Sequence, residues 1–246
     1  MSAGPERPLD RVGRLADTIE FSAVDGPGNR FVVFLQGCNL DCLACHNPQT
    51  IPVGGGRPVT VGDLVGQIRR AAPFLSGVTV SGGEATLQAA FVHDLFDAVG
   101  ADPQLARLTR FLDTNGDADP ATWDALDGVL DGAMVDLKAL DAATHVRLTG
   151  HGNDRILDSI RLLHARGKLH EVRLLLAAGA NDSDEALLAT GAWLARLDPR
   201  MRVKVIGYRA HGVRKAAASL VEPTADQRRH YGDALGGVAD FELTVV

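Results

Sequence analysis

Cysteine is scarce in this 246-residue chain: there are three, and all of them lie between positions 38 and 45. An odd, clustered set cannot form a disulfide framework for a chain of this length, which excludes a disulfide-rich secreted scaffold and indicates a reducing compartment. Long hydrophobic runs are also lacking, since the longest nearly apolar stretch, residues 174–180, is too short to cross a bilayer. The amino terminus has no apolar signal core. We therefore expect a cytoplasmic protein without a membrane partner.

An excess of positive charge is lacking as well. Lys and Arg together number 25 against 31 Asp and Glu, a net charge of −6 with a pI of about 5.7. This balance argues against a general nucleic-acid binder, which needs a basic surface. The hydrophobic share of 46% and the charged share of 23% are those of an ordinary globular protein and exclude disorder of the whole chain. No change in composition marks a second domain, so we expect one domain over residues 1–246 with an N-terminal extension at 1–17.

Apolar periodicity predicts alternating strands and helices. Repeated βα units imply a parallel sheet covered by helices. Six or seven strands are fewer than the eight of a closed barrel, so the α/β fold expected is a partial, open TIM-type barrel of about (β/α)6, with a doubly wound sheet as the alternative. Flexible loops are expected at 54–58 and 207–218. Strands are predicted at 31–35, 77–81, 110–113, 132–137, 171–177, 201–208 and 241–246, and helices at 61–72, 87–99, from 119–120 onward, 154–166, 182–197 and 224–235.

The cysteines have the spacing of a ligand set. Cys38, Cys42 and Cys45 form a C-x3-C-x2-C pattern directly after the first predicted strand, where an α/β architecture places its site. Thiolates are soft ligands that select zinc or iron–sulfur clusters. A structural zinc site needs a fourth ligand, which His46 could supply. An iron–sulfur cluster on three cysteines leaves one iron open to bind a small molecule.

Other polar residues follow the later strands. Gly82 and Gly83 end the second predicted strand and would let the backbone approach a ligand closely, and Glu84 would point a carboxylate into the site. The alternative is a tight turn in which Glu84 only favours the helix dipole. Asp136 and Lys138 are two apart, so both side chains take one face of a strand. A surface ion pair is the simpler interpretation of that pair.

Together these motifs resemble the radical S-adenosylmethionine (SAM) superfamily, and within it the glycyl-radical-enzyme activases of the pyruvate formate-lyase activating enzyme family. The resemblance runs from about Thr18 over nearly the whole chain and extends to YjjW-type activases in several stretches. Unlike those relatives, this chain has no ferredoxin-like insertion after the first loop, and three cysteines leave no ligands for a second cluster. The motifs that carry the resemblance to the activases are residues 24–30 (VDGPGNR), 34–38 (FLQGC), 45–48 (CHNP), 81–85 (SGGEA), 112–116 (LDTNG) and 135–138 (VDLK).

The resemblance implies roles for individual residues. Cys38, Cys42 and Cys45 would hold a [4Fe-4S] cluster, and Asp25 would lie near the incoming glycyl loop of the substrate protein. A monovalent cation, Na+ or K+, would be bound by Asp113 and Asp136 with backbone oxygens of Thr114 and Met134, because oxygen ligands suit a hard cation. The residues expected to contact SAM are Gly82, Gly83, Glu84, Asp113, Lys138, Arg173 and His211.

The activity implied is reductive cleavage of SAM to methionine and a 5′-deoxyadenosyl radical, which abstracts a hydrogen from a glycine Cα of a partner enzyme. A flavodoxin-like or ferredoxin-like protein would donate the electron, and we expect a monomer. Two alternatives stay open at this point. One is a radical SAM enzyme with a different small-molecule or peptide substrate, and the other is a non-catalytic zinc or electron-transfer module.

Overall fold

The computed structural model describes residues 8–246, and its backbone contacts divide the chain into two compact units. Unit 1 comprises residues 8–39, 49–114 and 118–133, and unit 2 comprises residues 40–48, 115–117 and 134–246. The boundary passes through the cysteine segment, so Cys38 belongs to unit 1 while Cys42 and Cys45 belong to unit 2. Each unit is described by itself.

Unit 1 is built on five strands in the order β3-β1-β2-β4-β5. Strands β2, β4 and β5 are parallel, whereas β1 pairs antiparallel with both β2 and β3. The parallel register sets Leu35 beside Gly82, so the carboxyl ends of β2 and β4 meet at one edge. The strands are β1 (Val12–Ser22), β2 (Arg30–Leu35), β3 (Arg57–Thr60), β4 (Gly77–Gly82) and β5 (Thr109–Thr114).

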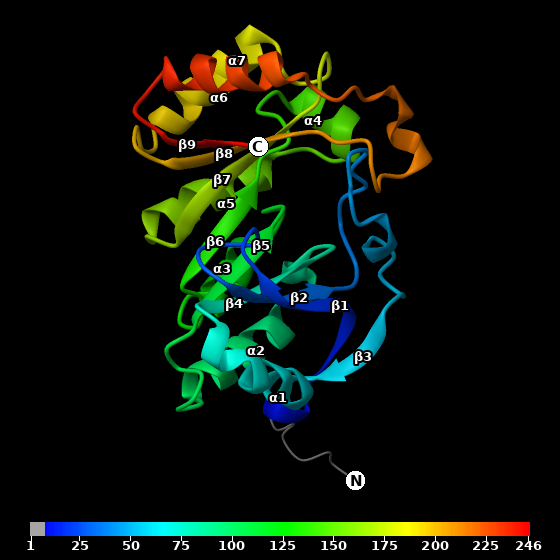
Figure 1. Cartoon of the computed structure of the whole chain (residues 1–246), viewed down its shortest axis with the longest axis vertical. Helices are drawn as coiled ribbons and strands as arrows, with labels where there is room; N and C mark the ends of the chain where they lie inside the picture. The colour runs from blue at the N-terminus through cyan, green and yellow to red at the C-terminus, as the bar shows by residue number, and fades with distance from the viewer. Residues whose placement is uncertain (1–7) are drawn as a thin grey trace. The chain divides into compact units, whose positions relative to one another are not determined.

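The helices of unit 1 bury the apolar stripe that their sequences predict. Helix α1 (Val61–Ala71) buries Leu64, Val65 and Ile68, and it begins with a capping box between Thr60 and Asp63. Helix α2 (Ala89–Ala101) packs against α1, and both lie on the same side of β2 and β4 in Figure 1. The other helices are α3 (Pro120–Leu126) and the short 3-10 helices η1 (Pro8–Asp10), η3 (Ala72–Phe74) and η4 (Ala85–Gln88).

Unit 2 continues the βα alternation. Strand β6 (Gly132–Asp136) starts in unit 1 and ends in unit 2, and β7 (Leu169–Leu176), β8 (Arg202–Gly207) and β9 (Glu242–Val245) follow it in spatial order, with β7, β8 and β9 parallel. Figure 1 shows α6 (Asp184–Ala195) and α7 (Ala225–Gly236) together beside β8 and β9. The remaining elements are α4 (Ala142–Thr149), α5 (Asp154–Ala165), η5 (Lys215–Ser219) and η2 (Pro48–Thr50), which begins at the unit boundary.

Most of the predicted elements are confirmed, with ends within two residues of those expected. The strand number is wrong, because residues 8–246 contain nine strands and β1 and β3 had no prediction. Both lie at the antiparallel margin of the sheet. β1 is long but polar along much of its length, and β3 is short and contains Pro58, which an edge strand tolerates. The cysteine segment therefore follows the second strand, and β3 takes the end of the loop predicted at 54–58.

The single-domain prediction and the limits of the N-terminal extension remain predictions, although residues 12–17 already belong to β1. No helix within residues 8–246 is both long enough and apolar enough to span a membrane.

Candidate functional site

The two glycines after β4 let its backbone approach that of the neighbouring strand and of the cysteine segment. A Cβ on Gly82 would lie 2.1 Å from the carbonyl oxygen of Leu35, and a Cβ on Gly83 would lie 2.2 Å from that of Gly37. The Gly83 amide donates to Leu35 at 2.9 Å, and the Glu84 amide donates to Gly37 at 2.7 Å. The glycines thus serve contact between backbones in unit 1, directly before Cys38, and their predicted role toward SAM stays a prediction.

The Glu84 carboxylate is fully buried and held by hydroxyl and amide donors. Its Oε1 accepts from the backbone amide of Thr86 at 2.9 Å and from the hydroxyls of Thr86 and Thr114, each at 2.7 Å. The amide bond caps the start of η4. Because Thr114 ends β5, Glu84 ties the ends of β4 and β5 together, and its role toward SAM stays a prediction.

Asp113, the next predicted residue, also lies where two parallel strands end. The Ser81 hydroxyl donates to Asp113 Oδ2 at 2.9 Å. Ser81 precedes Gly82 on β4, and Asp113 precedes the buried Thr114 on β5. Unit 1 therefore gathers Gly82, Gly83, Glu84, Asp113 and Thr114 at one edge.

The segment with Asp25 is fixed on the sheet by a buried arginine. Arg30 is fully buried and donates from Nε to the Thr79 hydroxyl at 3.0 Å and from Nη2 to the Val78 carbonyl at 2.6 Å. Burial lowers the pKa of Arg30 to about 10, with the charge of Asp131 acting the other way.

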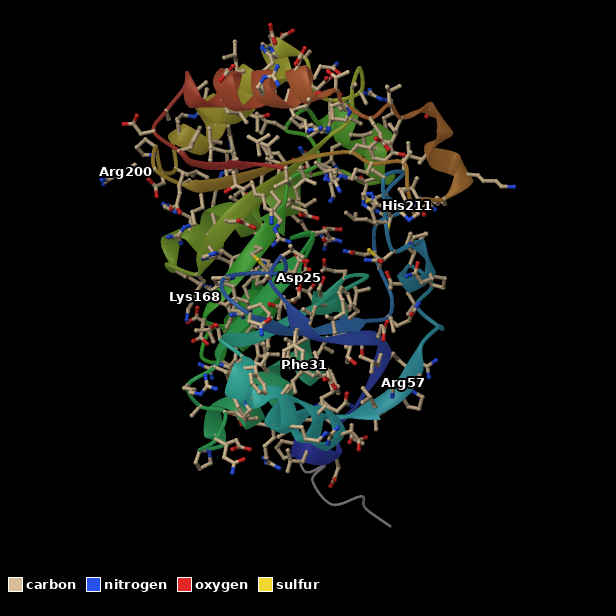
Figure 2. All side chains as sticks on the ribbon, in the orientation of Figure 1. Asp25, Phe31, Arg57, Lys168, Arg200 and His211 are labelled. Carbon is tan, nitrogen blue, oxygen red and sulfur yellow. The ribbon has the colours of Figure 1, made fainter. Side chains whose placement is uncertain are left out.

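Asp25 itself lies over the middle of β4. Its backbone oxygen accepts from the Thr79 hydroxyl at 2.7 Å, and its carboxylate accepts from the Ser22 hydroxyl. Thr79 and Ser81 are two residues apart on β4, so they share a face. Figure 2 shows Asp25 on the side of this sheet away from α1 and α2. The Asp25 loop therefore overlies the face of unit 1 to which Ser81 belongs.

The cysteine segment is anchored separately in the two units. In unit 1, the Cys38 amide donates to the Ile51 carbonyl at 3.0 Å. In unit 2, the amides of Asp41 and Leu43 donate to the last carbonyls of α4, at Thr149 and Leu148, both at 2.9 Å. None of the three cysteines forms a disulfide, and all three are half-buried.

Two residues near the end of β8 add contacts to the unit 2 part of the segment. Arg214 donates from Nη1 to Asp41 Oδ1 at 2.6 Å and from Nη2 to the Asp41 and Cys42 carbonyls at 2.6 and 2.9 Å. His46 Nε2 lies 2.9 Å from the Arg209 carbonyl, and its ring packs near Tyr208. These contacts hold His46 beside the residues that follow β8, and its alternative role as a zinc ligand stays a prediction.

Lys138 brings a positive charge near Cys42. The pKa of the Cys42 thiol is raised above its ordinary value, mainly by burial; the positive charges of Lys138 and Arg214 reduce this rise, and Cys45 and Asp136 add to it. Lys138 Nζ also pairs with Asp136 Oδ2 at 2.6 Å, which confirms that the two side chains share a face. A nearby cation favours the thiolate, which is the form that binds metal.

Arg173 and His211 occupy different settings within unit 2. Arg173 is buried on β7, where Nε pairs with Glu171 at 2.6 Å and Nη2 lies 2.8 Å from Met134 Sδ on β6. His211 is exposed in the turn after β8, as Figure 2 shows. The structure thus brings two predicted site residues, Arg173 and Met134, into contact and leaves His211 at the surface.

A pocket of about 550 Å³ lies within unit 2, between the end of β6, β7 and α6. Leu140, Leu174 and Leu176 contribute an apolar wall, and Ser183 and Thr190 contribute hydroxyl groups. Lys138 also lines it, so this one predicted residue borders a cavity as well as influencing Cys42.

The donor chemistry of the cysteine segment fits an iron–sulfur cluster. Three cysteines that form no disulfide lie on one short segment, and the Nε–H of Arg214 is a buried donor without a partner among the described residues. In the described part of the chain, no three His, Cys, Asp or Glu side chains form a group that could hold a metal ion. The ligand assignment therefore stays a prediction that rests on spacing and donor type.

Three residues with extensive contacts had no role in the sequence-based prediction. Arg214 carries no motif signal, because its partners lie more than 170 residues away. Arg30 is the last residue of the VDGPGNR segment, but nothing in the sequence shows its burial. His145 on α4 is fully buried and its Nδ1 lies 2.8 Å from the His151 carbonyl. The Asp141 cap and the left-handed Gly150 at the ends of α4 were available signals for that helix.

Comparison with known proteins places these features in a family. Residues 32–190 match the radical SAM superfamily. Pyruvate formate-lyase 1-activating enzyme of Escherichia coli (strain K12) is 34% identical over 214 residues, covering 84% of this chain and 85% of that protein. Pyruvate formate-lyase-activating enzyme of Streptococcus mutans is 35% identical over 211 residues, covering 81% and 79%.

A solved structure shares the fold. Streptococcus suis SuiB, solved bound to S-adenosylmethionine, superposes with a TM-score of 0.67 at 18% identity, over 85% of this chain and 48% of SuiB. At this identity the likeness shows the fold alone. The predicted fold class, a partial α/β barrel with a mostly parallel sheet, is confirmed.

Proposed function

This chain belongs to the radical SAM superfamily and is a homologue of the pyruvate formate-lyase-activating enzymes, and on that premise we propose that it activates a glycyl radical enzyme. The observation that carries the proposal is identity of 34% over 84% of the chain with an activase.

The superfamily's cofactors are a [4Fe-4S] cluster and SAM. When bound, the cluster supplies the electron that cleaves SAM to methionine and a 5′-deoxyadenosyl radical, which would take a hydrogen atom from a glycine Cα of the partner. We assign the three cluster ligands to Cys38, Cys42 and Cys45. Their number supports this assignment, because three thiolates leave one iron free for SAM.

The proposed SAM contacts come from both units. In unit 1, Gly82, Gly83, Glu84 and Asp113 lie at the carboxyl ends of β4 and β5, the edge at which parallel α/β sheets bind ligands. In unit 2, Lys138 follows β6 and carries a cation suited to the SAM carboxylate. Arg173 and His211 complete the proposed set.

The Asp25 loop is the proposed contact for the incoming glycine segment. It overlies the face that also carries Ser81, and Arg30 fixes it there through Thr79. A rigid loop on that face would orient a peptide beside the proposed SAM contacts. Glycine suits hydrogen abstraction at its Cα, because it has no Cβ that would block the approach of the 5′-deoxyadenosyl radical.

The remaining partners follow the family. A flavodoxin-like or ferredoxin-like protein would supply the electron, and the chain would act as a cytoplasmic monomer with one radical SAM domain. A Na+ or K+ ion would lie on Asp113, Asp136 and the backbone oxygens of Thr114 and Met134. The oxygen donors support such an ion, although Asp136 already pairs with Lys138.

The test is anaerobic reconstitution with iron, sulfide, SAM and a reductant, together with a glycyl radical enzyme encoded beside this gene. We expect a glycyl radical signal in the partner by electron paramagnetic resonance, and none with a Cys42→Ala variant. SAM cleavage without a glycyl radical in any neighbouring candidate would favour a different radical SAM substrate. A colourless protein that binds zinc would contradict both.

A further inference from the structure

Arg214 holds the Cys42 part of the cysteine segment from a distant part of the chain. Its two terminal nitrogens make three hydrogen bonds of 2.6 to 2.9 Å, to the carboxylate and carbonyl of Asp41 and to the carbonyl of Cys42. The fork geometry of a guanidinium spreads its donors over separate nitrogens, so it can engage a carboxylate and two carbonyls that the single nitrogen of a lysine would have to share. All of these residues belong to unit 2, so the clamp is internal to that unit.

One donor of the same guanidinium is left over. The Nε–H of Arg214 is buried, and it has no partner among the described residues. A buried donor without an acceptor costs about 1–3 kcal/mol and is rare in folded proteins. The surplus donor therefore indicates an acceptor that the chain itself does not supply. The main ligand expected here is the sulfur-rich cluster held by Cys42.

The positive charge of Arg214 also favours an interaction with the proposed cluster. Arginine stays protonated in proteins, so Arg214 places a fixed positive charge 2.9 Å from the backbone carbonyl of Cys42, a proposed cluster ligand. Hydrogen bonds to cluster sulfurs and net charge set the reduction potential of iron–sulfur clusters. A cation stabilises the reduced, more negative state relative to the oxidised state, and so raises the potential.

We propose that Arg214 is a positioning residue for the cluster, which clamps the Asp41–Cys42 backbone and turns a cationic N–H donor toward the cluster sulfurs. The inference rests on the ligand assignment of the proposed function, but not on the identity of the partner enzyme. Loss of the side chain would loosen the cluster and move its potential to more negative values.

Three variants test this in the reconstituted full-length protein. Arg214→Gln removes the charge and the fork, Arg214→Lys keeps only the charge, and Arg200→Gln is the matched control on an exposed arginine of the same unit, labelled in Figure 2. For each, iron content, the rate of iron release to a chelator and the midpoint potential are measured under anaerobic conditions. Melting temperatures of the metal-free proteins report folding.

We expect Arg214→Gln to release iron at least several-fold faster than the wild type and to have a more negative midpoint potential. Arg214→Lys should release iron faster but keep a potential nearer that of the wild type, and Arg200→Gln should match the wild type in both. Wild-type release and potential in Arg214→Gln would overturn the proposal. So would an equal drop in melting temperature of both Arg214 variants without any change in potential, since that indicates a structural role alone.

If Arg214→Gln binds no iron at all, Arg214→Lys decides: a cluster at wild-type potential supports the proposal, and none overturns it. Failure of the proposed function is seen separately. A wild-type protein that cleaves SAM but forms no glycyl radical would leave the Arg214 result intact.

Discussion

Gly83→Ala tests how closely the end of β4 approaches the segment that carries Cys38. The new Cβ would lie 2.2 Å from the Gly37 carbonyl oxygen and 2.8 Å from that of Thr50, whereas ordinary contact begins at 3.4 Å. Both neighbours are backbone atoms, so no side chain can rotate away. The two backbones must therefore separate by more than 1 Å.

The cost follows from what that separation breaks. The Glu84 amide bond to Gly37, 2.7 Å long, would be lost between buried groups, at about 1–3 kcal/mol. Overpacking a tight site adds about 1–3 kcal/mol. We expect a loss of about 2–6 kcal/mol, a large part of the roughly 5–15 kcal/mol that stabilises a typical domain.

The measurement is denaturant unfolding of the metal-free protein in reductant, compared with Gly54→Ala. A Cβ on Gly54 meets no atom within 4 Å, so this control should change the free energy of unfolding by less than about 0.5 kcal/mol. Gly83→Ala should also retain less iron after reconstitution, because Gly37 directly precedes Cys38. Equal stability of the two variants would refute the argument from backbone approach.

Three further predictions concern other residues. Thr114→Val should lower the free energy of unfolding by about 2 kcal/mol, because it removes a donor to a buried carboxylate; a loss within error of the wild type would contradict that role. Cys42→Ala should abolish both the cluster's visible absorption and SAM cleavage, and a variant that retains either one would remove Cys42 from the ligand set. Burial holds the pKa of His145 below its ordinary value, so the unfolded chain takes up the proton first as the pH falls through about 6.5. Wild-type stability should therefore fall toward acid more steeply than that of His145→Gln, by up to about 1.4 kcal/mol per pH unit, and parallel profiles from urea unfolding at pH 7.5 and 5.5 would contradict this.

The elements that could be predicted from sequence are those that bury one regular face. Helix α1 places Leu64, Val65 and Ile68 at helical spacing, and the central strands are short apolar runs between turn residues. Strand β1 could not be recognised in this way, because it is polar along much of its length and its pairing with β2 and β3 depends on distant residues.

In the candidate site, too, only the features with a local sequence pattern could be predicted. The cysteine spacing and the Asp136–Lys138 pair are local patterns, so the sequence alone indicated them. The actual partners of Glu84 depend on β5 lying beside β4, and the clamp of Arg214 on Asp41 spans 173 residues. Such contacts are made by topology, and no local pattern in the chain encodes them.

The central claim is that this protein removes a hydrogen atom from a glycine Cα of a partner enzyme. The most direct test supplies a partner labelled with deuterium at glycine Cα and measures the mass of the 5′-deoxyadenosine formed by mass spectrometry. We expect one deuterium in 5′-deoxyadenosine, in proportion to the glycyl radical formed in the partner. Cleavage of SAM that yields only unlabelled 5′-deoxyadenosine with every candidate partner would contradict it.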